Sequence, residues 1–229
     1  MIPRTLFVWA LGLPVTLAVF VAILATRPFD RTGRAAHSIG ALWCRIILAL
    51  SGVRVEVRGA EKVPRGEPVI LASNHQGAFD IPTLQAHLPI QFRWVAKKSL
   101  FSIPVVGWSM TLAGYIPIER ESATKAYRSM LEAAKKIRSG TTVVIFPEGT
   151  RSATGELGAF KRGGFTLAVK AGVPVVPVAI TGTKDVMRKG SLLIRPARVA
   201  MTFADPIPTE GKSEKELMAL TREAIETIL

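Results

Sequence analysis

The sequence predicts an α/β fold: a mixed, mostly parallel sheet flanked by helices and preceded by an N-terminal helical membrane module. From about residue 53 onward, short apolar runs alternate with segments of helical pattern, which is typical of strands alternating with helices. The first fifty residues hold a long uncharged run and an amphipathic helix pattern instead. We therefore divide the chain into membrane-associating helices at 1–51 and an α/β domain at 52–229.

The chain is strongly basic, with 30 Lys and Arg against 17 Asp and Glu in 229 residues and a net charge of +13. Nucleic acid and an anionic membrane surface are the usual partners of such a chain. The basic residues are scattered among apolar strands, and the sequence has no zinc-finger spacing, recognition-helix pattern or aromatic RNA-binding signature. We expect a membrane surface and a phosphorylated substrate as partners, and no nucleic acid.

The uncharged run covers residues 6–25 and is long enough to cross about 30 Å of hydrocarbon. Basic residues flank it on both sides, at Arg4, Arg27, Arg31 and Arg34. It is longer than the apolar region of a typical signal peptide and has no A-x-A cleavage pattern, so we expect it to be retained.

An amphipathic helix is predicted next, because its apolar residues recur at helical spacing while His37 and Arg45 lie largely off that face. The apolar face consists of Ile39, Leu42, Trp43, Ile46, Ile47 and Leu50. Two geometries remain open: a single transmembrane anchor, or two helices embedded in one leaflet. The alternative is that both helices pack on the core of a soluble protein.

The α/β domain begins with a half-exposed strand over 53–58, where valines alternate with charged residues. Further strands are expected at the apolar runs 69–72, 92–96, 116–118, 142–146, 175–180 and 198–203. The run 69–72 has no polar alternation, which suits a strand covered on both faces.

Helices are predicted between these runs, over 80–88, 99–112, from Ser122 to about residue 137, over 163–171, and from Ser213 onward. Ser122 is a suitable N-cap, and Gly172 is a suitable C-terminal stop. Ser213 and Glu216 have the spacing of a capping box.

Two polar residues follow the apolar run 69–72 and suggest acid–base catalysis. His75 comes directly after Asn74, the only asparagine in the chain, and Asp80 lies five residues further on. Catalytic groups in open α/β sheets gather at the carboxyl ends of strands. A neutral imidazole can take a proton from an alcohol, and a carboxylate on its other nitrogen would orient it. For this pair alone, the alternative is a polar loop histidine followed by a helix-capping aspartate.

A second strand end carries similar chemistry. The run 142–146 is followed by Pro147-Glu148-Gly149-Thr150-Arg151-Ser152, which places a carboxylate and a guanidinium in a turn. In parallel strands, these two turns would lie at the same edge of the sheet.

At these turns the sequence resembles the glycerolipid acyltransferase family, specifically its 1-acylglycerol-3-phosphate acyltransferases, whose motifs read N-H-x4-D and F-P-E-G-T-R-S. Both motifs occur here in that order, and the segments 114–120 and 173–178 resemble the family's two other motifs. The likeness covers about residues 53–204. Pro117 and Glu119 depart from the commonest form of the family, where Phe and Asp are usual.

The resemblance implies transfer of an acyl group from a thioester to the sn-2 hydroxyl of 1-acylglycerol 3-phosphate, giving phosphatidic acid. His75 would act as the general base, and Asp80 would orient it. The residues that the resemblance implies for acceptor binding are Lys97, Arg120, Glu148, Gly149, Thr150 and Arg151, with Lys161 as a further candidate. The arginines would bind phosphate oxygens through their planar forks, and Lys97 would add a point charge.

We expect no metal and no cofactor, with acyl-CoA or an acyl carrier protein thioester as the donor substrate and a lysophospholipid as the acceptor. The single Cys44 can form neither an internal disulfide nor a metal site of its own. The expected location is the cytoplasmic face of the inner (plasma) membrane.

Alternative functions also remain open. Related enzymes use glycerol 3-phosphate, a lyso-aminolipid or another lysophospholipid as acceptor. A hydrolase would give the acyl group to water, and a basic membrane-surface binding protein would have no turnover. The segment 99–112 either lines a groove for the acyl chain or is an ordinary core helix.

Overall fold

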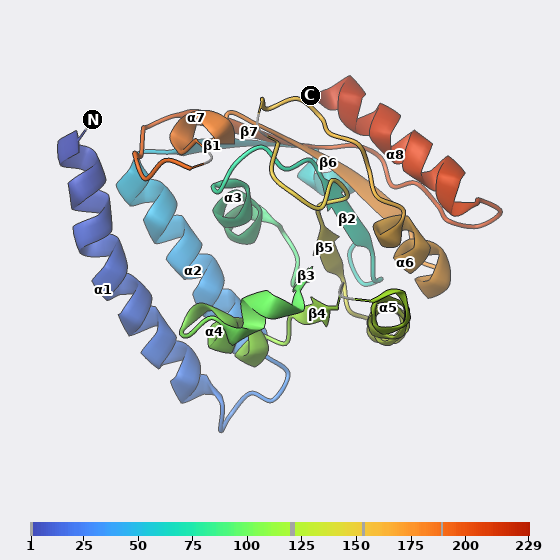
Figure 1. The fold of residues 1–229 in the computed structure, drawn as a ribbon, viewed down its shortest axis with the longest axis horizontal. Coiled ribbons are helices and arrows are strands. Elements are labelled where there is room, and N and C mark those ends of the chain that lie inside the picture. Colours follow the sequence, from blue (N-terminus) through green and yellow to red (C-terminus); the bar gives the residue numbers. More distant parts are fainter. Residues whose placement is uncertain (1, 120–121, 153, 189) are drawn as a thin grey trace.

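The computed structural model describes residues 2–119, 122–152, 154–188 and 190–229. Within these residues, one seven-stranded sheet has helices on both faces (Figure 1). The strands are β1 Arg54–Arg58, β2 Ile70–Ser73, β3 Arg93–Lys97, β4 Ile116–Ile118, β5 Val143–Ile145, β6 Val175–Thr181 and β7 Arg198–Phe203. The helices are α1 Ile2–Thr26, α2 Arg34–Ser51, α3 Asp80–His87, α4 Val106–Leu112, α5 Ala123–Arg138, α6 Gly163–Ala171, α7 Thr183–Val186 and α8 Glu214–Ile228.

The sheet is mixed and mostly parallel, as predicted, with the strand order β1-β7-β6-β2-β5-β3-β4. β2 to β6 run in one direction, whereas β7 is antiparallel to β6 and β1 is parallel to β7. The amino ends of β1 and β7 therefore lie at the same sheet edge as the carboxyl ends of the other five strands.

The core is divided by the sheet into two apolar layers. Leu71 of β2 points to the layer that contains α2 and α3, while its neighbours Ile70 and Ala72 point to the layer of α5, α6 and α8. All three side chains have no exposed surface, which explains why β2 is apolar without alternation.

The caps predicted for the helices are confirmed. The Ser122 hydroxyl accepts a hydrogen bond from the Lys125 amide at the start of α5, and Gly172 ends α6 in the left-handed region. Ser213 and Glu216 form the predicted capping box of α8.

The two N-terminal helices form as predicted and pack antiparallel to each other along one side of the molecule (Figure 1). By length and composition, α1 is a candidate membrane span, and most of its large side chains are exposed. α2 buries Cys44 and Leu48 in the layer shared with α3. It also buries His37, which the sequence pattern placed on the polar face. The division at residue 51 stays a prediction, but α2 contributes to the core of the α/β domain.

The predicted helix over 99–112 is wrong as a single element. The structure forms a 3₁₀ turn over Lys98–Ser102 and begins α4 only at Val106. Pro104 lies at the break, where its ring removes a backbone donor and restricts the residue before it. Val105 has a left-handed φ of 64°, an uncommon conformation for a β-branched residue.

Candidate active site

Asn74 fixes the end of β2, from which His75 projects. Its side-chain Nδ2 donates to the Ile180 carbonyl at 2.9 Å, and its Oδ1 accepts from the Ile180 amide at 2.7 Å. The buried amide therefore satisfies both backbone groups of Ile180 and joins β2 to β6 where the strands separate. The only asparagine of the chain thus positions the next residue, His75.

His75 and Asp80 form the predicted pair. His75 Nδ1 lies 2.6 Å from Asp80 Oδ2, and Asp80 has no exposed surface. Oδ2 also accepts the Gly77 amide at 2.8 Å, and Oδ1 accepts the hydroxyl of Thr183. Three donors therefore stabilise the negative charge of the carboxylate. The pair fixes the tautomer with a proton on Nδ1, which leaves Nε2 to accept a proton.

The imidazole plane is held by an aromatic stack. Phe146 lies against the His75 ring with 3.9 Å between centroids and an angle of 10°, and Trp94 stacks on Phe146 at 5.5 Å. The Trp94 indole N–H donates to Gln85 Oε1 at 2.6 Å, and the Tyr115 hydroxyl donates to the same oxygen at 3.2 Å. These contacts restrict rotation of the imidazole about its hydrogen bond to Asp80.

Glu148 is buried and holds the backbone of the His75 turn. One carboxylate oxygen accepts the His75 amide at 2.7 Å, and the other accepts the Gly158 amide at 3.0 Å. The Ser152 amide donates to the His75 carbonyl at 2.8 Å. Glu148 thus joins the two motif turns, and its expected contact with the acceptor stays a prediction.

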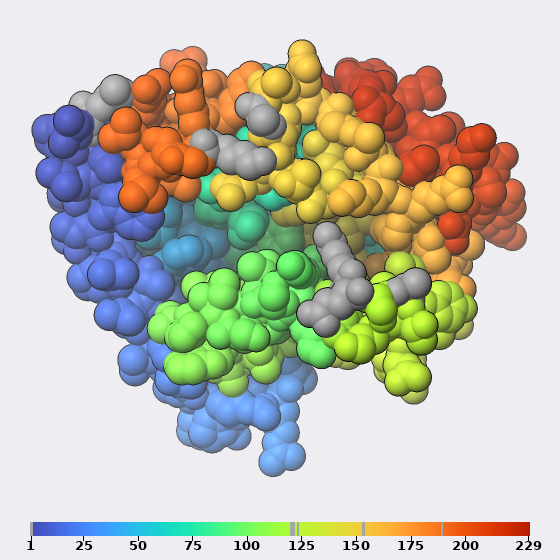
Figure 2. All heavy atoms as spheres, viewed as in Figure 1, coloured from blue at the N-terminus to red at the C-terminus, as the bar shows by residue number. Residues whose placement is uncertain are grey.

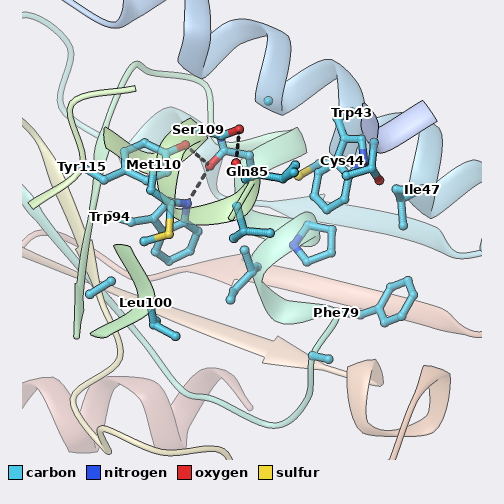
Figure 3. A pocket seen from close by; sticks show the side chains of 18 of the residues that line it. Trp43, Cys44, Ile47, Phe79, Gln85, Trp94, Leu100, Ser109, Met110 and Tyr115 are labelled. Carbon is cyan, nitrogen blue, oxygen red and sulfur yellow. Dashed lines mark hydrogen bonds between the residues drawn. The ribbon is translucent and has the colours of Figure 1, made fainter. Parts of the chain in front are cut away.

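A cavity of about 780 Å³ lies between the α/β domain and the N-terminal helices, and His75 is among its lining residues. Its walls are mainly apolar and come from α1, α2, α3 and α4. Figure 3 shows Trp43 and Ile47 of α2 on one side and Leu100 and Met110 on the other. Figure 2 shows the surface hollowed above α4, drawn in green, and below the yellow and orange segments. Because α4 and the turn before it line the cavity, the structure favours the groove-lining alternative for 99–112 over an ordinary core helix, despite the break.

The basic residues predicted to bind phosphate are partly gathered at this cavity. Lys97, Gly149, Thr150 and Arg151 all line it beside His75. Arg120 lies outside the described residues, so its role stays a prediction. Gly149 has a φ of 71°, which favours glycine at this turn.

The neighbouring Lys98 has a different position from Lys97. Its Nζ lies 3.1 Å from a Glu119 carboxylate oxygen, and Lys125 lies 3.6 Å from the other oxygen. The hydrogen bond from Lys98 lowers the pKa of Glu119 below its usual range. Lys98 thus pairs with Glu119, while Lys97 is one of the residues that line the cavity.

Sequence reasoning missed Thr183, Phe146 as a stacking partner, and Gln85. Thr183 begins α7, a short helix that was not predicted, and it lies 103 residues from Asp80 in sequence. Only the position of Phe146 inside the F-P-E-G-T-R-S motif signalled a role for it. Gln85 has no local signal, because its partners come from three distant segments.

Comparison with known proteins gives consistent matches. The family model described as "Acyltransferase" matches residues 54–181. A 1-acyl-sn-glycerol-3-phosphate acyltransferase from Chlamydomonas reinhardtii is 33% identical over 97% of this chain and 68% of that protein. The chloroplastic relative BAT2 from Brassica napus is 38% identical over 71% of this chain, which matches only 47% of that relative's length. The crystal structure of the 1-acyl-sn-glycerophosphate acyltransferase PlsC from Thermotoga maritima superposes with a TM-score of 0.84. It is 28% identical and covers 99% of this chain and 93% of its own.

A histidine–carboxylate pair whose histidine lines a large apolar cavity, on a helix-flanked mostly parallel sheet, fits an enzyme that transfers apolar acyl groups. The chain belongs to the acyltransferase family. The predicted resemblance is thereby confirmed.

Proposed function

We propose that this protein transfers an acyl group from a thioester to the sn-2 hydroxyl of 1-acylglycerol 3-phosphate, giving phosphatidic acid. The observation that carries the proposal is the His75–Asp80 pair beside the 780 Å³ apolar cavity, which His75 lines together with Arg151 and Lys97. The relatives from Brassica and Chlamydomonas are both named as 1-acyl-sn-glycerol-3-phosphate acyltransferases, which supports this acceptor here.

In the proposed reaction, His75 Nε2 takes the proton of the acceptor hydroxyl as its oxygen attacks the thioester carbonyl carbon. The new C–O ester bond forms and the C–S bond breaks. The imidazolium then returns its proton to the leaving thiolate, and Asp80 stabilises the transient positive charge throughout. The step needs no covalent enzyme intermediate.

The acceptor phosphate would be bound by Arg151 and Lys97, together with Arg120. Its acyl chain and that of the donor would occupy the apolar cavity, which His75 lines. Thr150 and Gly149 line the cavity together with Arg151 and His75 and would contact the glycerol. The donor is an acyl-CoA or an acyl carrier protein thioester, and no further cofactor is required.

We further propose that the enzyme works at the cytoplasmic face of the inner membrane. Arginines lie at both ends of α1, with Arg4 in its first turn and Arg27 and Arg31 after its last residue, which favours helices embedded in one leaflet over a span with one end translocated. The acceptor and the product both carry acyl chains, so the cavity has to open at the lipid interface.

Product analysis tests the function. Purified protein is given an acyl thioester and 1-acylglycerol 3-phosphate, and we expect phosphatidic acid and free thiol in equal amounts. Free fatty acid would indicate a hydrolase, and no product would indicate a binding protein. A panel with glycerol 3-phosphate, a lyso-aminolipid and other lysophospholipids assigns the acceptor.

His75→Ala tests the mechanism. General base catalysis contributes about 10²–10⁴-fold, so turnover should fall by that factor while the protein stays folded. Asp80→Asn should be nearly as damaging, because an amide neither fixes the tautomer in the same way nor stabilises the imidazolium. Rates like those of the wild type in either folded variant would contradict the assigned base.

A further inference from the structure

A second hollow, separate from the catalytic cavity, lies between the start of α1, the end of α2 and the sheet edge formed by β1 and β7. It is open and has a volume of about 580 Å³. Three arginines line it, Arg4 from α1, Arg54 from β1 and Arg198 from β7, and none of its described lining residues is acidic. Positive charge therefore gathers at this place from three separate segments of the chain.

The strand register forces two of these charges together. Arg54 and Arg198 are direct partners in the parallel pair of β1 and β7, so their side chains leave the same face of neighbouring strands about 4.8 Å apart. Like charges in direct cross-strand positions destabilise a sheet. The two like charges nevertheless occur here, at the first residue of each strand.

The third charge is placed by a glycine. Gly52 ends α2 with a φ of 67°, and a Cβ built on it would overlap the Arg4 guanidinium. Arg4 therefore lies directly over the C-terminal end of α2, whose partial negative charge it partly offsets. That half charge does not balance three guanidinium groups.

No side chain in the described residues 2–119, 122–152, 154–188 and 190–229 makes an ion pair or a side-chain hydrogen bond with any of the three arginines. The nearest acids along the chain have other partners: Glu56 pairs with Arg58 at 2.8 Å, and Asp205 pairs with Lys62 at 3.0 Å. The cluster therefore lacks an anion, which a ligand would supply.

The position of the hollow indicates where that anion comes from. Because β1 and β7 run opposite to the other strands, Arg54 and Arg198 lie at the sheet edge that also carries His75. Just beyond Arg4, α1 exposes Leu6, Phe7 and Trp9. An exposed apolar helix beside a basic hollow matches the order of acyl chains and phosphates in a leaflet.

We propose that Arg4, Arg54 and Arg198 form a binding site for the phosphate group of an anionic phospholipid headgroup, distinct from the site of acyl transfer. Guanidinium groups match phosphate oxygens in bidentate geometry, and three of them around one hollow suit a single phosphate. The site orients the sheet edge toward the lipid and needs no turnover, so it does not rest on the proposed function.

Calorimetric titration of the full-length protein in a neutral detergent tests the site, with dihexanoyl phosphatidylglycerol as the probe. The variant R54Q/R198Q removes two charges from the hollow. R27Q/R31Q removes two exposed charges at the other end of α1 and serves as the matched control. We expect saturable binding that weakens at least about tenfold in R54Q/R198Q and changes less than about twofold in the control. The wild type and both variants have the same catalytic cavity. Lipid that binds there therefore contributes equally to all three titrations.

Inorganic phosphate is titrated in a parallel arm. Tighter binding of the lipid than of phosphate supports a headgroup site, whereas equal affinities would overturn the lipid assignment in favour of free phosphate. Equal losses of lipid affinity in R54Q/R198Q and R27Q/R31Q would overturn the site. They would show general electrostatic attraction, which depends on the number of charges and not on where the charges lie. A thermal unfolding curve like that of the wild type confirms that R54Q/R198Q is folded.

Discussion

At the scale of single residues, the site depends on the hydrogen-bond donors that surround a buried carboxylate. Asp80 has no exposed surface, yet it accepts hydrogen bonds from the His75 ring, the Gly77 amide and the Thr183 hydroxyl. A buried charge is tolerated only when its hydrogen bonds are made. We therefore expect Thr183 to be a positioning residue for the proposed catalytic pair.

Thr183→Val tests this role. The change keeps the shape of the side chain but removes a donor to a buried charge, an interaction of about 1.5–3 kcal/mol. We expect kcat to fall about tenfold to a hundredfold with little change in the acceptor KM, because the residues proposed to bind phosphate are untouched. Thr183→Ser keeps the hydroxyl and should restore most of the rate. A Val variant as active as the wild type would exclude the role.

Phe146→Leu tests the aromatic stack on His75. Aromatic pairs contribute about 0.5–1.5 kcal/mol beyond the area they bury, so the loss of imidazole alignment should lower kcat by about two- to tenfold. Phe146→Tyr keeps the ring face and serves as the control. Steady-state kinetics on both variants decide the point: if Leu and Tyr behave alike, the stack does not position the base.

At the scale of elements, a buried polar cluster joins α2 to the catalytic core. Gln85 of α3 donates to the His37 carbonyl at 3.2 Å and accepts from Trp94, whose ring stacks on Phe146 beside His75. Burial, with a further contribution from the charge of Arg93, lowers the pKa of His37 to about 3. The imidazole in α2 is therefore neutral when the protein is folded.

This pKa gives a pH dependence of stability. In the unfolded chain a histidine has a pKa of about 6.5, so between about pH 6.5 and pH 3 the unfolded state binds more protons than the folded state. The contribution of His37 is complete above pH 6.5 and is lost as the pH falls, by up to about 1.4 kcal/mol per pH unit.

His37→Gln removes this titration. We expect the variant to lose less stability than the wild type between about pH 7.5 and pH 5.5, measured as the change in Tm in detergent at the two values. The comparison uses the change with pH, so a constant destabilisation by the substitution does not matter. Parallel pH profiles of the two proteins would show that His37 is not the titrating group.

At the scale of the whole molecule, exposed apolar side chains lie on segments around the catalytic cavity. α1 exposes Leu6, Phe7 and Leu13, α4 exposes Trp108, and the segment before β7 exposes Leu192. The Trp9 indole donates to the Leu192 carbonyl at 3.1 Å, so that segment is fastened to α1. Large exposed apolar surfaces mark interaction sites, and here lipid is the occupant we propose.

The triple variant Leu6→Gln, Phe7→Gln and Leu13→Gln tests membrane attachment. Each of these side chains contributes about 1.5–3 kcal/mol when it is buried in an apolar environment. The wild type should sediment with liposomes in about 1 M NaCl, where charges are screened beyond about 3 Å. The triple variant should stay in the supernatant.

The matched control for attachment is Leu131→Gln with Leu220→Gln, which changes exposed apolar residues on α5 and α8 away from α1. It should sediment like the wild type. Wild-type protein that remains soluble in high salt would contradict a hydrophobic anchor and favour packing of α1 in a soluble protein. These variants avoid deleting residues 1–51, which would remove the buried Cys44 and Leu48 from the core.

Much of the fold follows from local patterns in the chain. Alternating valines in β1, the unbroken apolar run of β2, and the caps at Ser122 and Ser213 are short-range signals that the structure confirms. The break near Pro104 was visible in sequence as a proline, but its consequence was not, because the contacts of α4 with distant segments decide where the helix resumes.

By itself, the sequence determined the succession of strands and helices apart from α7 and the break before α4, the apolar N-terminus and the two motif turns, because each depends on neighbouring residues. The tertiary structure decided what those turns contact. It brought Thr183 to Asp80 across 103 residues, turned Lys97 to the cavity while Lys98 pairs with Glu119, and placed Arg54 beside Arg198. The physical reason is that hydrogen bonds, burial and charge act through space, and strand order and direction set those distances.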